Sequence, residues 1–203
     1  MTETNRVLAI GLDGGTFDLL LPLVEKGYLP NISRVLDTGS WGRLNSTIPP
    51  FTPVAWSTFA TGKNPGGHGI LTFEKRNAYH YHQEVDGFVD SRQLKNTLWD
   101  ILSAANKHVG VINVPLTYPP HRVNGFMITG MMTPSSSHEF TYPPELSEQL
   151  HDYLIDVEFI REDDSFRRYG LPSKAEMMHQ IHQMTQLRTA TTLKLLQEKR
   201  GIS

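Results

Sequence analysis

The chain has 203 residues, of which 38% are hydrophobic and 20% charged, so it is long enough to bury a hydrophobic core. The net charge is −2 and there is no cysteine, which excludes disulfides and predicts neither a nucleic-acid partner nor a cysteine metal site. The first residues lack the basic region of a signal peptide, and no apolar run approaches the ~20 residues of a membrane span. We therefore expect a cytoplasmic protein without a membrane segment.

The first predicted element is a strand over residues 7–12, a continuous apolar run that ends in Asp13 and two glycines. A run that does not alternate predicts a strand buried on both faces, as in a parallel sheet. Asp13 would then lie at the C-terminal end of a strand, where open α/β sheets bind ligands. The alternative is a carboxylate that shapes the turn or caps the next helix.

Two helices are predicted next, over residues 17–25 and 31–37, because glycine and proline interrupt the pattern after each of them. A short strand over residues 42–47 should lead into the two prolines that follow. Proline fixes its own φ and restricts the preceding residue, so the approach to the next helix is extended.

That next helix begins at Thr52, with Thr52 predicted as the N-cap and Pro53 as the first helical residue. Gly62 and Pro65 should end it. The Thr52 hydroxyl would lie at the positive end of a helix, where backbone N–H groups attract phosphate. The alternative is an ordinary capping threonine.

Residues 71–94 mix aromatic side chains with charges and histidine, which predicts an excursion from the core, in the form of a hairpin that lies over the site as a lid. His80 and His82 would share one side of a strand there. No third ligand follows at zinc spacing, so an exposed polar face is favoured over a metal site.

A helix is predicted over residues 96–106, with Leu98, Ile101 and Leu102 facing inward. Another continuous apolar run predicts a strand over residues 109–114.

Asn113 lies near the end of that strand and, in a parallel sheet, at the same edge as Asp13. It either contacts substrate or bonds the turn, and the sequence leaves both open. A further short strand is predicted over residues 126–129, followed by a loop over residues 131–137.

The last third of the chain should form a helix over residues 144–154, a charged segment around Asp163 and Asp164, and a long helix over residues 174–199. The paired acids suggest a cation site, but a solvated loop is favoured. We expect the apolar stripe of the long helix to be partly uncovered.

His179 and His182 could share a face of that long helix. Without a third ligand they are interpreted as surface residues.

Strands that alternate with helices predict an α/β fold with a mostly parallel central sheet flanked by helices. Several motifs along the chain also have a fixed order: Gly11-Leu-Asp13-Gly14, Leu29-Pro-Asn-Ile32, Pro49-Pro-Phe-Thr52-Pro53, Thr61-Gly62 and His68-Gly-Ile70. In this order they resemble the type I phosphodiesterase/nucleotide pyrophosphatase branch of the alkaline phosphatase superfamily. Two later segments, Val111-Ile-Asn-Val-Pro115 and Thr141-Tyr-Pro-Pro-Glu145, resemble a prokaryotic subgroup of it.

The resemblance implies an alkaline phosphatase-like fold and a metal-dependent hydrolase of phosphate esters, either phosphodiesters or pyrophosphates. It implies that Asp13 is a metal ligand and that Thr52 is the catalytic nucleophile and also a metal ligand. It implies a small phosphate ester as the substrate and two divalent metal ions, with zinc as the usual metal. Asn113 is a candidate substrate contact from its position at the end of a strand.

Two departures from the family pattern modify this expectation. The run directly after the His68-Gly-Ile70 element, Leu71-Thr-Phe-Glu74, contains no asparagine, which weakens the prediction of a nucleotide substrate. Family enzymes take their remaining metal ligands from a C-terminal half with an Asp-His motif, and no such motif precedes Ser203. We therefore expect residues 1–203 to be the N-terminal part of a truncated alkaline phosphatase-like domain that is active only with a C-terminal half.

Two alternatives remain open. One is a non-catalytic fragment or binding module. The other is a different superfamily activity such as that of a phosphomutase. A sulfatase is disfavoured, because Phe51-Thr-Pro-Val-Ala55 stands where sulfatases carry Cys/Ser-x-Pro-x-Arg.

Overall fold

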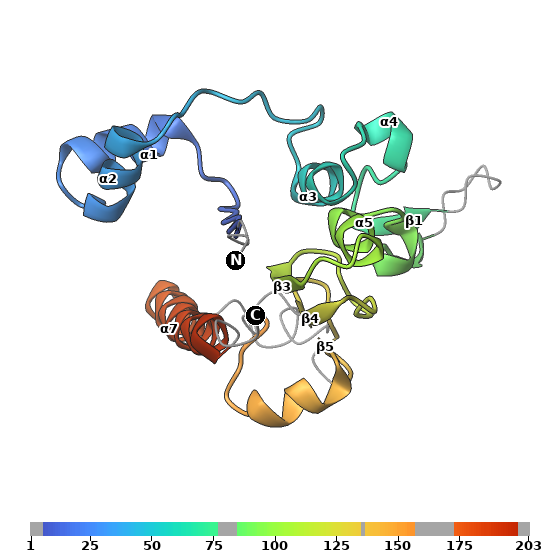
Figure 1. Cartoon of the computed structure of the whole chain (residues 1–203). Coiled ribbons are helices and arrows are strands. Elements are labelled where there is room, and N and C mark those ends of the chain that lie inside the picture. Colours follow the sequence, from blue (N-terminus) through green and yellow to red (C-terminus); the bar gives the residue numbers. More distant parts are fainter. Residues whose placement is uncertain (1–5, 77–84, 135–136, 157–172, 199–203) are drawn as a thin grey trace, which may run out of the picture. The chain divides into compact units, whose positions relative to one another are not determined.

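The computed structural model describes residues 6–76, 85–134, 137–156 and 173–198 (Figure 1). The chain divides into two compact units, Met1–Ser46 and Thr47–Ser203, and each is described by itself. No helix in the described ranges is long and apolar enough to cross a membrane.

The first unit contains two short helices, α1 (Phe17–Glu25) and α2 (Pro30–Thr38), which confirms both predicted helices. Thr16 caps α1 by accepting a hydrogen bond from the backbone N–H of Asp18 at 3.3 Å. Arg43 forms an exposed ion pair with the Asp18 carboxylate at 2.9 Å.

The two strands predicted in the first unit, over residues 7–12 and 42–47, are wrong for this structure. Neither segment is assigned as strand, and Val7 and Ile10 are 93% and 76% exposed. A strand exists only where its N–H and C=O groups pair with a neighbouring strand. No strand partner is present among residues 6–46, so the apolar run alone does not produce a strand.

The second unit contains a three-stranded sheet. Strands β3 (Val109–Val114) and β4 (Gly125–Thr129) pair in parallel, and β5 (Thr141–Tyr142) pairs with β4 in antiparallel orientation. The strands predicted over residues 109–114 and 126–129 are confirmed. The fold is therefore mixed α/β with small sheets, and the large, mostly parallel central sheet is not seen in the described part of the chain.

A hairpin forms where the excursion was predicted. Strand β1 (Glu74–Arg76) pairs in antiparallel orientation with β2 (Val85–Phe88). Residues 77–84, which include His80 and His82, lie outside the described residues. The lid function of the hairpin stays a prediction.

The remaining helices all belong to the second unit: α3 (Thr52–Thr61), α4 (Pro65–His68), the 3-10 helix η1 (Ser91–Gln93), α5 (Leu98–Ala104), the 3-10 helix η2 (Pro144–Gln149) and α7 (Lys174–Glu198). The element predicted over residues 144–154 is thus a shorter 3-10 helix. The inward side chain of α5 is Trp99, which is 3% exposed, while Leu98 and Ile101 are 46% and 58% exposed. The predicted inward face is wrong, because Trp99 packs in the core cluster with Val111 and Met127.

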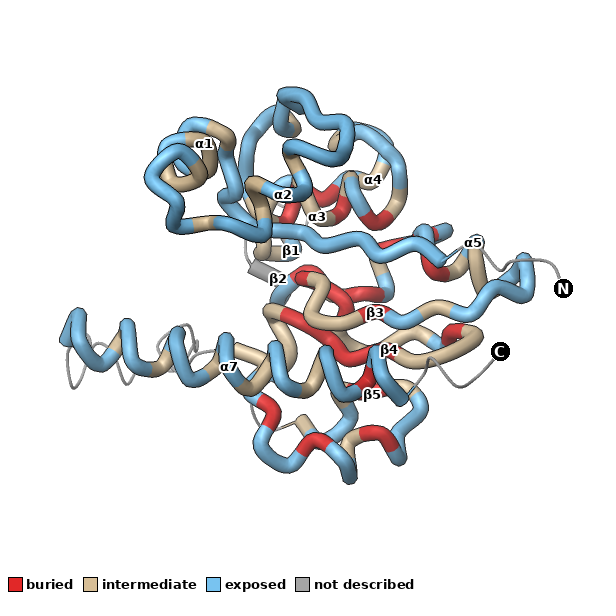
Figure 2. The backbone as a smooth tube through the Cα atoms, turned by 60° about the vertical axis from the view of Figure 1, so that its left-hand side comes forward, coloured by how far each residue is buried: buried red, intermediate tan, exposed pale blue. Residues whose placement is uncertain are grey.

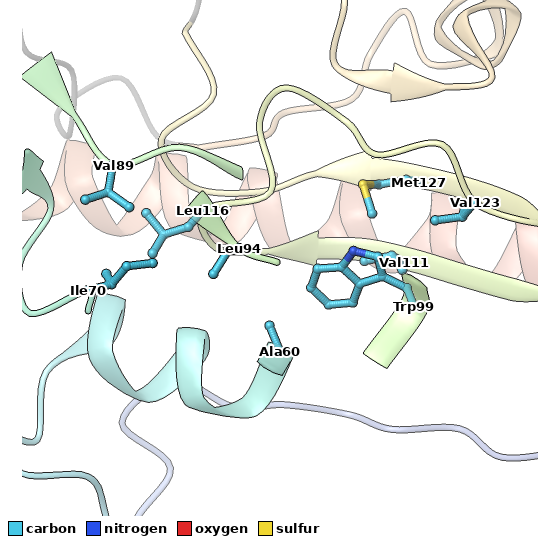
Figure 3. Packing of buried hydrophobic residues seen from close by; sticks show 9 residues of the cluster. All are labelled: Ala60, Ile70, Val89, Leu94, Trp99, Val111, Leu116, Val123 and Met127. Atoms are coloured by element: carbon cyan, nitrogen blue, oxygen red, sulfur yellow. The ribbon is translucent and has the colours of Figure 1, made fainter. Parts of the chain in front are cut away.

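The three-stranded sheet carries a hydrophobic cluster on each face, because successive strand residues point to opposite sides. On one face Val111 and Met127 pack with Trp99 of α5 and Ala60 of α3 (Figure 3). On the other face Ile128 packs with residues of η2 and with Leu195 of α7. Helices therefore cover both faces of this small sheet.

Helix α7 confirms the long helix predicted over residues 174–199. Its described residues are mostly exposed, whereas buried residues concentrate in β3, β4 and the segments that pack on them (Figure 2). Leu195 is buried, but Ile181, Leu193 and Leu196 remain exposed. The expected partly uncovered stripe is present.

Candidate functional site

Helix α3 begins at Thr52, one residue earlier than predicted. The backbone N–H groups of Val54 and Ala55 both donate to the carbonyl oxygen of Phe51, at 3.0 and 2.9 Å. Phe51 has extended backbone angles and is therefore the N-cap, and Thr52 is the first helical residue. The prediction of Thr52 as the N-cap is wrong. Capping was the alternative to a functional role for Thr52, and Phe51 is the residue that caps the helix.

The start of α3 is held from both sides. Pro53 and Val54, directly after Thr52, are buried. Phe51, directly before it, makes an edge-on contact with Phe73, with ring centroids 5.4 Å apart. The half-buried Thr52 side chain is therefore carried on a fixed helix end, close to the residue that leads into β1. The predicted end of the helix is confirmed, because Gly62 adopts φ +66°.

His68 joins the short helix α4 to α3. Its Nδ1 accepts a hydrogen bond from the Ile70 backbone N–H at 3.1 Å, so Nε2 carries the proton and donates to Thr58 Oγ1 at 3.0 Å. Burial lowers the pKa of His68, and nearby Lys63 lowers it further, while a hydrogen bond with the Val54 backbone acts in the opposite direction. A neutral His68 thus positions the loop that follows α4.

A cavity of about 500 Å³ lies beside that loop. Its walls are residues 69–72, Glu74 and Lys75 of β1, and Val89 and Gln93 after β2. The volume is within the range of small-molecule sites, about 300–1,000 Å³. Sequence reasoning did not predict this cavity, because the walls come from a loop and a hairpin that meet only in the folded chain.

Asn113 lies at the C-terminal end of β3 with a left-handed backbone, φ +58°. Its amide nitrogen faces the Tyr153 hydroxyl at 2.7 Å, and its oxygen accepts from the Arg188 Nε at 2.5 Å. This amide orientation is the consistent one, since a guanidinium can only donate. Burial raises the pKa of Tyr153 to about 12 and lowers the pKa of Arg188.

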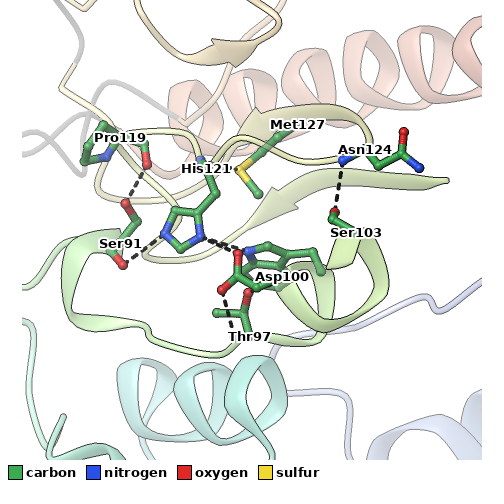
Figure 4. Close-up of polar contacts among 9 residues, drawn as sticks. Ser91, Thr97, Asp100, Ser103, Pro119, His121, Asn124 and Met127 are labelled. Carbon is green, nitrogen blue, oxygen red and sulfur yellow. Dashed lines mark hydrogen bonds and ion pairs between the residues drawn. The ribbon is translucent and has the colours of Figure 1, made fainter. Parts of the chain in front are cut away.

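A second polar cluster, which sequence reasoning missed, surrounds His121 (Figure 4). The Nε2 of His121 donates to the Ser91 carbonyl oxygen at 3.1 Å. Its Nδ1 faces the Asp100 carboxylate at 3.1 Å and the indole N–H of Trp99 at 3.3 Å. The Thr97-x-x-Asp100 spacing is that of a capping box and can be recognised in the sequence. Nothing in the sequence links this motif to His121.

Asp13 belongs to the first unit, whereas Thr52 and Asn113 belong to the second. Asp13 is exposed and occupies a turn in which the Gly15 N–H donates to the Leu12 carbonyl oxygen at 3.2 Å. Gly14 in this turn has φ +65°, and a turn at this point is the alternative role that the sequence left open for Asp13.

The described residues do not complete the predicted metal site. Within the described ranges, no group of three or more histidine, aspartate or glutamate side chains could hold one metal ion. Zinc takes about four ligands, so Asp13 and Thr52 are too few for the expected two-metal site. Asp163 and Asp164 lie outside the described residues, and His179 and His182 are exposed on α7, as expected of surface residues.

The fold and this site define a mixed α/β protein with a threonine on the first turn of a partly buried helix. The family model for type I phosphodiesterase / nucleotide pyrophosphatase matches residues 7–194. The chain therefore belongs to this family of enzymes, whose members typically use metal ions and act on phosphate esters. Searches of curated proteins and of solved structures gave no significant match.

Proposed function

We propose that the protein is a metal-dependent hydrolase of phosphate esters, acting on a phosphodiester or a pyrophosphate, with Thr52 as the nucleophile. The observation that carries this proposal is the position of Thr52. It is the first residue of α3 and follows Phe51, which acts as the N-cap. Family membership supplies the reaction class, and the positive end of the helix favours a phosphoryl group beside this hydroxyl.

The chemistry proceeds in two steps. The Thr52 oxygen attacks phosphorus and loses its proton, while the bond from phosphorus to the leaving oxygen breaks and that oxygen gains a proton. Water then attacks the phospho-threonine, which releases the phosphate product and restores the hydroxyl. No oxidant or reductant is needed, because only a phosphoryl group and protons move.

We propose Asp13 and Thr52 as ligands of divalent metal, with zinc as the preferred ion and two ions in the complete site. Bound metal would lower the pKa of the threonine hydroxyl and offset negative charge on the phosphoryl group. Metal binding at these two residues requires further ligands, since the described residues bring no group of three together.

Asn113 remains a proposed substrate contact at the C-terminal end of β3. Its amide already bonds Tyr153 and Arg188, so a substrate there would share or replace those hydrogen bonds. The alternative role of Asn113 is to bond the turn that follows β3.

The change Thr52→Ala tests the nucleophile. We expect it to lower turnover by about 10³-fold or more, because the attacking atom is removed. Thr52→Ser is the matched control, since it keeps a hydroxyl, and it should retain measurable turnover. The assay is run on the intact enzyme, with the C-terminal half that we expect to supply the remaining metal ligands, in the presence of zinc. Its substrates are p-nitrophenyl phosphate, its diester and its sulfate, and circular dichroism checks the fold. An unchanged rate in Thr52→Ala would show that Thr52 is not the nucleophile.

The substrate panel also separates the alternatives. Preference for the diester supports a phosphodiesterase, and preference for the sulfate contradicts one. A binding module without turnover predicts no hydrolysis by the wild type and no zinc binding in calorimetry. Tight binding of two zinc ions would contradict that alternative.

A further inference from the structure

The imidazole of His121 faces hydrogen-bonding groups that it cannot all satisfy at once. It lies between Ser91 and Asp100 (Figure 4), and its Nε2 is 3.1 Å from the Ser91 carbonyl oxygen. A carbonyl oxygen can only accept, so Nε2 carries a proton. The Nδ1 is 3.1 Å from an Asp100 carboxylate oxygen and 3.3 Å from the indole nitrogen of Trp99. An ionised carboxylate can only accept and an indole N–H can only donate, so Nδ1 bonds one of these two groups at a time.

The charge of the ring decides which of the two bonds forms. A neutral His121 keeps its proton on Nε2, so its Nδ1 accepts from the Trp99 indole and turns a lone pair toward Asp100. A protonated His121 also carries a proton on Nδ1, which donates to Asp100, and the indole N–H loses its acceptor. Histidine is the side chain that ordinarily changes charge between about pH 5 and 8, and the exchange of partners is expected in that range.

The other described groups around the ring do not compete for this proton. In the described part of the chain, Asp100 is the titratable side chain in direct contact with the imidazole. Arg92 of η1 pairs with Asp90 at 2.6 Å instead. From β4, the sulfur of Met127 lies 3.3 Å from the His121 backbone N–H and does not titrate. The exchange therefore involves one proton and one carboxylate.

Loss of the indole hydrogen bond matters because Trp99 is part of the core. Trp99 is 3% exposed and packs in one cluster with Val111 and Met127 of the sheet and Ala60 of α3 (Figure 3). Among the described residues, His121 is the acceptor for its Nε1–H. A buried donor without an acceptor is unfavourable, so Trp99 should move toward water or another acceptor. That movement changes the packing of α5 against α3.

We propose that His121 is a proton switch, in which a proton taken up on Nδ1 transfers its hydrogen bond from Trp99 to Asp100 and releases the indole from its fixed place in the core. The proton comes from the solvent and returns to it when the pH rises. The switch couples pH to the packing of α3, the helix that begins with Thr52. It does not depend on the proposed hydrolase chemistry, because neither the Thr52 hydroxyl nor a metal ion takes part in it.

The test follows the Trp99 indole N–H and the His121 ring nitrogens by NMR, on the nitrogen-labelled full chain, from about pH 8 to about pH 5. We expect the Trp99 signal to shift along the same curve as the His121 Nδ1 signal. The indole signals of Trp41 and Trp56 are internal references and should not follow that curve, because neither indole is among the described contacts of His121. A Trp99 signal that stays constant over this range would overturn the proposal.

The variant His121→Gln removes the group that takes up the proton and should abolish the pH-dependent shift of the Trp99 signal. His108→Gln is the matched control, because His108 is an exposed histidine outside this cluster, and it should leave the shift unchanged. A shift that persists in His121→Gln would show that another group causes it.

Asp100→Asn is a second variant that keeps the imidazole, so the switch can be tested even if His121→Gln does not fold. A neutral amide favours the charged imidazole less than a carboxylate does, so the Trp99 shift should occur at lower pH than in the wild type. A shift at unchanged or higher pH would exclude Asp100 as the partner of the protonated ring and overturn the proposal.

Discussion

Single side chains in this protein are held by partners far away in the sequence. His121 bonds the backbone of Ser91 and faces Asp100 and Trp99, so one ring connects η1, α5 and the approach to β4 (Figure 4). Its Nδ1 accepts from the indole of Trp99 when neutral and donates to Asp100 when protonated. The charge of the Asp100 carboxylate therefore affects the strength of its contact with His121.

The pKa of Asp100 sets the sign of one pH effect. Burial alone would raise that pKa, but hydrogen bonds from Thr97 and His121 outweigh it, and the pKa is lowered. A carboxyl whose folded pKa is lowered stabilises the fold above its unfolded pKa. That stabilisation is lost as the pH falls through the folded pKa.

We therefore expect Asp100→Asn to reduce the free energy of unfolding by about 1 kcal/mol at neutral pH, because a hydrogen bond to a charged group becomes neutral. The difference from wild type should shrink in acid. Urea unfolding followed by tryptophan fluorescence in neutral and acidic buffer measures it. Asp152→Asn, at an exposed position, is the control and should change nothing. The acidic buffer lies below the ordinary pKa of an aspartate, about 3.9, and a difference that keeps its full size there would contradict the assigned sign.

At the scale of elements, close backbone contact decides how β3 and β4 end. The register of this parallel pair shifts between Ile112 and Val114. Gly130 follows β4 there, and a Cβ at this position would lie 2.4 Å from the Val114 carbonyl oxygen. Its N–H donates to Thr117 Oγ1 at 3.0 Å. Only glycine fits between the two strand ends.

Gly130→Ala should consequently lower stability by about 2 kcal/mol or more, since the backbone around Asn113 and Val114 must move. Gly66→Ala is a suitable control, because a Cβ there meets its nearest atom at an ordinary 3.6 Å. Thermal unfolding of both variants gives the comparison. Equal melting temperatures for the two variants would show that the strand ends are not as close as described.

The element predictions succeeded where the signal is local. Helices α1, α2 and α3 and strand β3 follow from caps, proline placement and continuous apolar runs. The Thr52 cap was wrong by one residue, because the carbonyl of Phe51 receives the first helical hydrogen bonds. The inward face of α5 was also wrong, since Trp99 reaches the core and Leu98 does not.

At the scale of the whole molecule, the second unit is organised by the two faces of its sheet. Leu195 of α7 joins the cluster under Ile128, η2 and Tyr153, while the opposite cluster contains Trp99 and Met127. Much of α7 lies outside these clusters and is exposed (Figure 2). The attachment of α7 therefore depends on a few buried side chains.

Leu195→Ala should destabilise the second unit by about 2 kcal/mol or more, through lost burial and the cavity left behind. Leu193→Ala is the matched control on the same helix, because Leu193 is 55% exposed and Leu195 3%. Chemical denaturation, with hydrogen exchange of the α7 amides, measures both effects. If the two variants were equally stable, Leu195 would not anchor α7.

The sequence by itself determined the family, because its short motifs each consist of neighbouring residues and follow one another in a fixed order. It also determined the helix that carries Thr52, whose start and end signals are local. It also predicted the hairpin and the two central strands from composition and continuous apolar runs. Only the tertiary structure decided that residues 7–12 form no strand in their unit, that Asn113 meets Tyr153 and Arg188, and that the loop after His68 and the hairpin line one open cavity. Pairing, burial and enclosure depend on groups distant in sequence, and a local pattern carries no information about which of them meet.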